Sequence, residues 1–121
     1  MSKPVEVVET YFRAMQRGAQ AAEELFALFA EDAVYIEPFS GETRTHTGKP
    51  AIERYLTASW DQAPPDLELQ VDRVDLDGEI VVSEWTCRSP ALPRPFRGRD
   101  RCTVQEGRIQ RLEVEFLSED G

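Results

Sequence analysis

Histidine and cysteine are scarce in this 121-residue chain, and their scarcity removes several kinds of site. His46 is the single histidine, which excludes a metal site built on two histidines and weakens schemes in which histidine activates a nucleophile. Cys87 and Cys102 lack the spacing of a metal or redox pair, so we expect buried free thiols. The sequence therefore indicates neither a zinc site nor a dithiol site.

Long apolar runs and an excess of basic charge are also missing. No run approaches the roughly 20 residues of a membrane helix, and MSKPVEVVET lacks the apolar core and cleavage site of a signal peptide. With 14 Lys and Arg against 23 Asp and Glu, the formal net charge is -9. Binding nucleic acid depends on neutralising phosphates, so no nucleic-acid partner is expected. We expect a cytoplasmic protein without a membrane partner.

What remains is a globular composition, with 40% hydrophobic and 31% charged residues. Its length predicts a single domain over residues 1–121, large enough for a core and a pocket. Hydrophobic periodicity places helices before strands, the order of an α+β fold in which helices cover one face of a curved sheet. The expected helices span about residues 4–18, 21–29 and 49–60, and the strands 33–38, 43–47, 67–76, 79–88, 96–104 and 108–117. Pro64 and Pro65 break the pattern after the third helix, a change of alternation after Val71 predicts a β-bulge near Asp72, and Asp77-Gly78 predicts a hairpin.

Three polar side chains occupy positions where the periodicity predicts burial. Glu37 lies in the apolar run VYIEPFSG, Tyr11 lies beside the apolar stripe of the first helix, and Asp100 shares one face of FRGRDRCTV with apolar residues. A buried carboxyl must be paired, hydrogen bonded or protonated, and such groups are site candidates. Each also has a structural interpretation: a core tyrosine, an edge carboxylate, and an acid paired with an arginine.

Four segments together resemble a known family. They are VETYFRAM, LFAEDAVYIEP, G-x-x-AIERY, and GRDRCTV followed by a turn and a final strand. This order is similar to the nuclear transport factor two-like superfamily, in its SnoaL-like and ketosteroid isomerase-like branch, over about residues 4–117. The resemblance implies a cone-shaped, cystatin-like α+β barrel, in which three N-terminal helices wrap a curved, mostly antiparallel mixed sheet.

The resemblance also implies catalytic roles. In such isomerases a tyrosine and a protonated aspartate hold the substrate oxygen, and a carboxylate before a proline moves the proton; these roles fall on Tyr11, Asp100 and Glu37. Here the base is Glu where the isomerases have Asp, one methylene longer. The implied function is cofactor-independent proton transfer on a small, largely apolar carbonyl compound through an enolate, with isomerase and polyketide cyclase not separated.

We expect aromatic residues to shape the pocket, together with two polar residues from the segment after Pro38. The expected substrate-binding residues are Phe39, Trp60, Trp85, Phe96 and His46. Arg44 and His46 should lie near the mouth, where a cationic rim suits a carboxylate or phenolate ligand. They could equally pair with Glu37 or Glu42.

Two other functions stay open. The chain could be a non-catalytic module that binds a small molecule or dimerises, because this superfamily includes such proteins. An epoxide hydrolase would need an arginine flanked by two inward acids, whereas the consecutive Arg99 and Asp100 should face opposite sides of the sheet. A homodimer is expected through the outer face of the sheet, where Arg97, Arg99 and Arg101 lie.

Overall fold

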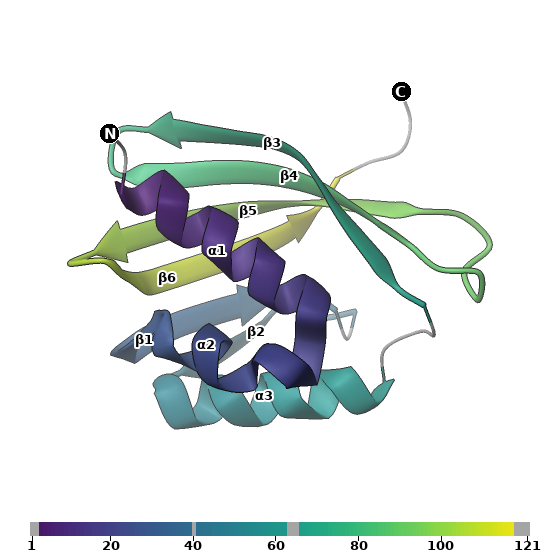
Figure 1. The fold of residues 1–121 in the computed structure, drawn as a ribbon, viewed down its shortest axis with the longest axis horizontal. Helices are drawn as coiled ribbons and strands as arrows, with labels where there is room; N and C mark the ends of the chain where they lie inside the picture. The colour runs from purple at the N-terminus through teal and green to yellow at the C-terminus, as the bar shows by residue number, and fades with distance from the viewer. Residues whose placement is uncertain (1–2, 40, 63–65, 118–121) are drawn as a thin grey trace.

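The computed structural model describes residues 3–39, 41–62 and 66–117 (Figure 1). A short 3-10 turn, Gly18–Ala21, joins the first two helices. The helices are α1 (Lys3–Arg17), α2 (Ala22–Ala27) and α3 (Lys49–Gln62), and the strands are β1 (Phe29–Glu37), β2 (Arg44–Thr47), β3 (Glu68–Asp77), β4 (Ile80–Arg88), β5 (Phe96–Gln105) and β6 (Arg108–Phe116).

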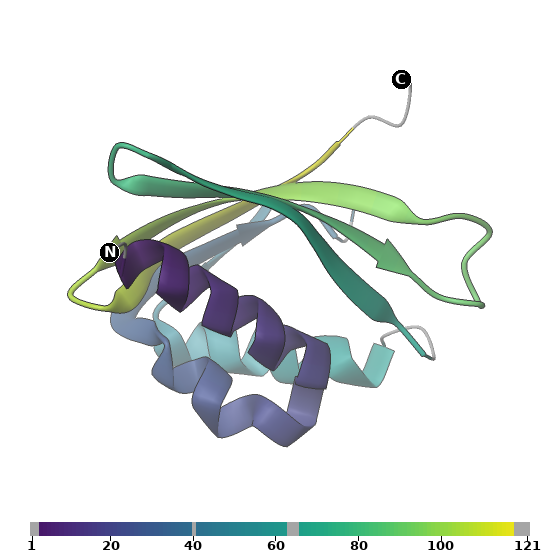
Figure 2. The ribbon, with the colours of Figure 1, turned by 45° about the horizontal axis from the view of Figure 1, so that its top comes forward.

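The strands form one mixed sheet in the order β2-β1-β6-β5-β4-β3. β1 and β6 are parallel, and every other neighbouring pair is antiparallel. The edge strands β2 and β3 do not pair with each other, so the sheet is curved but open. The helices lie together on one side of it (Figure 2), which confirms the predicted α+β architecture.

The core lies between the inner face of the sheet and the helices. On β5 the predicted alternation is confirmed, because Gly98, Asp100 and Cys102 are buried while Arg101 is exposed. The outward arginines of β5 pair with Glu84 and Glu115 of the adjoining strands. None of the described helices combines the length and apolarity needed to span a bilayer.

The turns and the bulge follow the local sequence. The β3–β4 register shifts between Val71 and Arg73, which confirms the bulge expected near Asp72. The two strands are joined at the predicted Asp77-Gly78 hairpin, where Gly78 has φ +65°. These features depend on neighbouring residues, so the sequence pattern was sufficient to locate them.

The boundary between the second helix and β1 was predicted wrongly. α2 ends at Ala27, and Phe29 belongs to β1, which starts four residues before the expected Ala33. Phe29 is fully buried and pairs with Ile109 of β6, whose backbone N–H donates to the Leu28 carbonyl at 2.7 Å. Pairing with a strand 80 residues further along the chain thus overrides the local helical pattern. The predicted break at Pro64 and Pro65 lies outside the described residues.

Candidate active site

A cavity of about 650 Å³ opens between α1, α3 and the sheet. Its wall is mainly apolar and includes Phe12, Met15, Leu56, Leu69 and Val114. Among the described residues that line it, Asp100 is the one carboxyl group and Arg44 the one cation. A concave apolar site with a few polar groups is the usual form of a small-molecule site.

Asp100 is the buried carboxyl of this cavity. Its side chain comes from the inner face of β5, and Trp85 Nε1 donates a hydrogen bond to Oδ1 at 2.9 Å. Burial raises the pKa of Asp100 to about 7, while the Trp85 hydrogen bond acts in the opposite direction. The described arginines of β5 pair on the outer face, so none neutralises Asp100. Near neutral pH the carboxyl can therefore hold a proton and donate it in a hydrogen bond.

Gly98 makes this arrangement sterically feasible. It lies directly opposite Trp85 in the β4–β5 ladder. A Cβ atom at Gly98 would meet the Trp85 ring at 2.1 Å, far inside van der Waals contact. The indole can cross β5 and reach Asp100 because residue 98 has no side chain.

Two tyrosine hydroxyl groups accompany Asp100. Tyr11 of α1 and Tyr35 of β1 are both buried, line the cavity and hydrogen bond to each other. Burial, and then neighbouring groups that include Asp100, raises the pKa of each well above its usual value. Both phenols therefore stay protonated at neutral pH. One of the two O–H groups donates to the other tyrosine, which leaves one O–H group to donate to a ligand.

Glu37 is fully buried, which agrees with the interpretation of an acid held in the interior and not with that of an edge carboxylate, but it does not line the cavity. Its Oε1 accepts from the Phe39 backbone N–H at 2.8 Å. Its Oε2 accepts from Arg44 Nε at 3.0 Å and lies 2.8 Å from His46 Nε2. Tyr55 of α3 also hydrogen bonds to Glu37. We call Glu37, Arg44, His46 and Tyr55 the Glu37 cluster.

The Glu37 cluster follows from the register of β1 and β2. Glu37 lies opposite Arg44, and Tyr35 lies opposite His46. These two opposite pairs are two residues apart along the strands, so their side chains share the inner face of the sheet at its β2 edge. His46 also stacks on Tyr55 with ring centroids 4.3 Å apart. Of the two interpretations left open for Arg44 and His46, pairing with Glu37 is observed for both residues. Arg44 alone of these two also lines the cavity.

The structure brings most of the predicted site residues to one cavity. Tyr11, Asp100, Phe39, Trp60, Trp85 and Phe96 line it, whereas Glu37 and His46 lie beside it in the Glu37 cluster. Sequence reasoning missed Tyr35 and Tyr55 as site residues. Tyr35 is two positions before Glu37 and therefore lies on the same face of β1, so alternation along the strand could have identified it. The position of Tyr55 depends on how α3 packs against the sheet, which the sequence pattern does not specify.

One buried polar atom near Asp100 has no partner. Ser83 of β4 is fully buried and lies opposite Asp100 in the β4–β5 ladder. Its Oγ has no hydrogen-bond partner among the residues that the structure describes. Over the same residues, no group of three His, Cys, Asp or Glu side chains is arranged to hold a metal ion.

The fold and the cavity define a small cone-shaped α+β protein with a polar, acid-containing interior. The chain belongs to the SnoaL-like domain family, whose sequence model matches residues 8–112. No curated protein sequence matches it significantly.

Solved structures agree on the fold. A candidate ketosteroid isomerase from Kribbella flavida is 23% identical, with a TM-score of 0.77 over 98% of this chain and 81% of its own. A candidate polyketide cyclase from Sinorhizobium meliloti is 26% identical, with a TM-score of 0.75 over 91% of this chain and 94% of its own. TerC, crystallised with polyporic acid, is 17% identical, with a TM-score of 0.79 over 96% of this chain and 92% of its own.

The arginine-centred arrangement of an epoxide hydrolase is not formed at Arg99. Its guanidinium pairs with Glu84 and Glu115 on the outer face, while Asp100 points to the inner face. The two residues therefore act on opposite sides of the sheet, as their consecutive positions predicted.

Proposed function

We propose that the protein is an acid–base enzyme that moves a proton on a small, largely apolar carbonyl compound through an enolate. The observation that carries the proposal is the position of Asp100. This carboxyl, with a pKa raised to about 7 by burial, lines an apolar cavity together with the hydroxyl-bearing Tyr11 and Tyr35. Preorganised donors of this kind stabilise a developing oxyanion in a site that excludes water.

The reaction follows from these roles. The substrate carbonyl accepts hydrogen bonds from Tyr11 and protonated Asp100. A carboxylate base removes the proton from the adjacent carbon, and the C–H electron pair forms the enolate. The same base then returns the proton to a different carbon, which regenerates the carboxylate and leaves a rearranged ketone. Each oxyanion donor contributes roughly a hundred- to a thousandfold in rate in comparable sites.

Glu37 is the proposed base, but hydrogen bonds from its neighbours occupy its carboxylate. Both carboxylate oxygens already accept hydrogen bonds, from the Phe39 N–H, Arg44 and His46. Glu37 can take a proton from substrate only after at least one of these partners moves. We therefore propose that productive binding rearranges the Glu37 cluster.

The test is isomerisation of a β,γ-unsaturated ketone, followed by the absorbance of the conjugated enone. Activity should fall strongly in Glu37→Gln, and by about a hundred- to a thousandfold in Asp100→Asn and Tyr11→Phe. Asp61→Asn, a change to an exposed acid at the end of α3, is the matched control. Activity that survives Glu37→Gln, or no activity on steroid-like and smaller ketones, would reject the isomerase form of the proposal.

A second candidate function is non-catalytic binding of a small molecule. It is favoured by the hydrogen bonds that the Glu37 carboxylate already accepts from its neighbours. A carboxylate that is fully buried and already paired needs no catalytic role to explain it. The TerC structure with polyporic acid supports binding of small molecules by this fold. In this case phenols or carboxylic acids should raise the melting temperature without turnover, because they bind only the native state.

A further inference from the structure

The cavity has two polar ends, and only one of them is used by the proposed reaction. Tyr11, Tyr35 and Asp100 form the donor end. Arg44 reaches the cavity from β2, at the edge of the sheet. In the β1–β2 ladder Arg44 lies opposite Glu37, two residues beyond Tyr35, an offset of about 7 Å along the strand.

Arg44 keeps donors available for a ligand. Its pairing with Glu37 uses Nε, and its Nη groups have no acceptor among the described residues. The guanidinium also lies 5.7 Å from the Tyr55 ring centroid, which holds it over an aromatic surface. A guanidinium presents a planar fork of donors that suits a carboxylate.

The local charge contrasts with that of the whole chain. The protein carries a net charge of -9, yet the one cation among the described cavity-lining residues is Arg44. Asp100 is the one carboxyl in that lining, and in its protonated form it does not repel an anion. Arg44 is therefore the one cation of the described wall that can pair with an anionic group of a ligand, through the Nη donors that its contact with Glu37 leaves over.

We propose that the ligand of this cavity is an amphipathic acid: a rigid apolar ring system with a carbonyl or hydroxyl at the Tyr11–Asp100 end and a carboxylate bound by Arg44. This inference rests on the proposed function for the donor end and adds the recognition of the acid. The apolar wall between the two ends accounts for the ring system.

The experiment compares 6-hydroxy-2-naphthoate with its methyl ester by isothermal titration calorimetry. The two probes have nearly the same shape, so their affinity ratio isolates the carboxylate. The acid should bind roughly tenfold or more tightly than the ester, as a charge-assisted pair allows. Raising the salt from about 50 mM to about 500 mM should reduce the ratio, since Arg44 is half exposed and screened.

Variants locate the effect. Arg44→Met should bring the acid-to-ester ratio close to one, whereas Arg44→Lys should retain part of it. Arg54→Met removes the same charge from an exposed position on α3 and should leave the ratio unchanged. If Arg44→Met fails to fold, the double variant Glu37→Gln/Arg44→Met removes the pair without leaving a buried unpaired charge.

Equal affinity of the two probes, a ratio that survives Arg44→Met, or no binding of the acid at millimolar concentration would overturn the proposal. The same titrations distinguish an error in the proposed function from an error in the proposed role of Arg44. Ester affinity that is unchanged in Asp100→Asn counts against the proposed function. A lost preference for the acid, with ester binding still sensitive to Asp100→Asn, counts against the Arg44 proposal alone.

Discussion

At the scale of single residues, Asp100 couples the candidate site to the stability of the fold. Its pKa of about 7 lies above the 3.8 of an unburied carboxyl, because burial disfavours the charged form. Between these two values the native state binds a proton that the unfolded state has released. The contribution of Asp100 to stability is therefore fully present below about pH 4 and is lost as pH rises through 7.

We predict that Asp100→Asn removes this pH dependence. At pH 8 the variant should be more stable than the parent by up to about 4 kcal/mol, and near pH 4 the difference should vanish. Urea unfolding of both proteins across this range measures it, with the exposed Asp61→Asn as control. A stability difference that stays constant with pH would contradict the raised pKa.

Ser83 allows a second prediction, because its buried hydroxyl has no partner among the described residues. Ser83→Ala should keep the stability or raise it by about 1 kcal/mol, since it removes an unpaired polar group. Thr86→Val is the matched control on the same strand, because Thr86 donates to Asp72 at 2.5 Å and should lose about 1 kcal/mol. A clear loss of stability in Ser83→Ala would show that Ser83 has a partner in solution.

At the scale of elements, the paired strands β4 and β5 fix the position of the Asp100 carboxyl. Trp85 and Asp100 come from adjacent strands, and the missing side chain at Gly98 lets the Trp85 indole lie over β5 and reach Asp100. The geometry of the site therefore depends on one glycine that makes no polar contact with Asp100.

We predict that Gly98→Ala destabilises the protein by about 1–3 kcal/mol, because the new methyl group overlaps the Trp85 ring. The displaced indole should show a red-shifted fluorescence in the folded state. A double-mutant cycle with Trp85→Leu identifies the cause, since Gly98→Ala should cost much less when the large ring is absent. Equal costs in both backgrounds would place the strain elsewhere.

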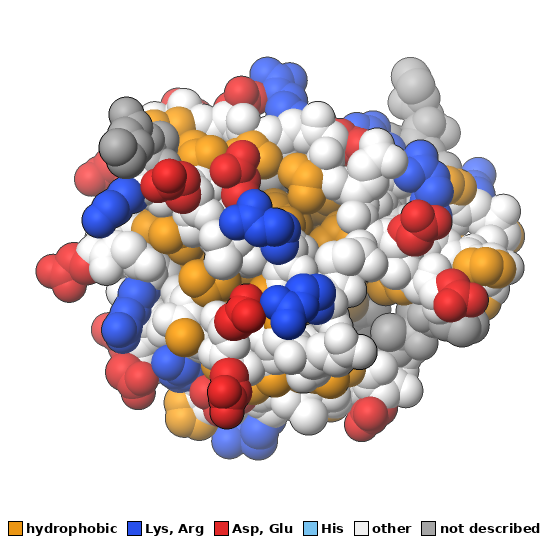
Figure 3. Space-filling model, viewed as in Figure 1, with side chains coloured by type: hydrophobic (Ala, Val, Ile, Leu, Met, Phe, Trp, Pro, Cys, Tyr) orange, Lys and Arg blue, Asp and Glu red, His pale blue; other side chains and the backbone are white. Residues whose placement is uncertain are grey.

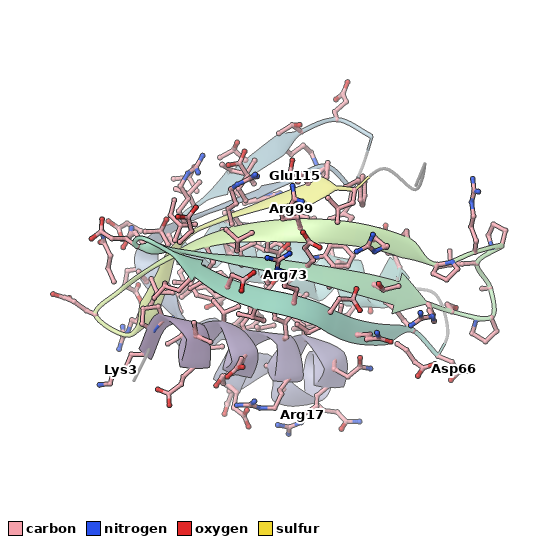
Figure 4. The ribbon with its side chains drawn as sticks, turned by 90° about the horizontal axis from the view of Figure 1, so that it is seen from above. Lys3, Arg17, Asp66, Arg73, Arg99 and Glu115 are labelled. Atoms are coloured by element: carbon pink, nitrogen blue, oxygen red, sulfur yellow. The ribbon has the colours of Figure 1, made fainter. Side chains whose placement is uncertain are left out.

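At the scale of the whole molecule, the outer face of the sheet is a network of ion pairs. Arg73, Arg99 and Glu115 lie across the strands in Figure 4. Arg99 bridges Glu84 at 3.0 Å and Glu115 at 3.4 Å. On the face shown in Figure 3, acidic and basic side chains are interspersed with hydrophobic ones over α1 and its neighbours. The arginines expected to serve a dimer are therefore paired within their own chain.

The homodimer remains a prediction. We expect light scattering at micromolar concentration to give twice the 13.8 kDa of the chain, through the outer face of the sheet. Arg99→Glu should weaken the dimer, because it reverses a charge next to Glu84 and Glu115 and so gives the two facing sheet surfaces an excess of negative charge that repels between protomers. A monomer at this concentration, or a dimer unaffected by Arg99→Glu, would contradict the predicted interface.

The sequence alone determined the faces of the strands and the short-range turns. Asp100 was placed inside because alternation along one strand depends only on backbone geometry, and the bulge at Asp72 follows from the same rule. Tyr11 was recognised from its position beside the apolar stripe of α1, and Glu37 from its position in a short apolar run of β1. Local pattern failed at Phe29, where pairing with Ile109 from the far end of the chain decided the structure.

Only the tertiary structure decided what each buried polar group contacts. Glu37 meets Arg44 and His46, while Asp100 meets Trp85 and none of the described arginines. These contacts join different elements, and they depend on strand register and side-chain packing, which periodicity does not specify. The sequence thus identified the acids of the site, and the fold determined that Asp100 faces the cavity while Glu37 is held beside it.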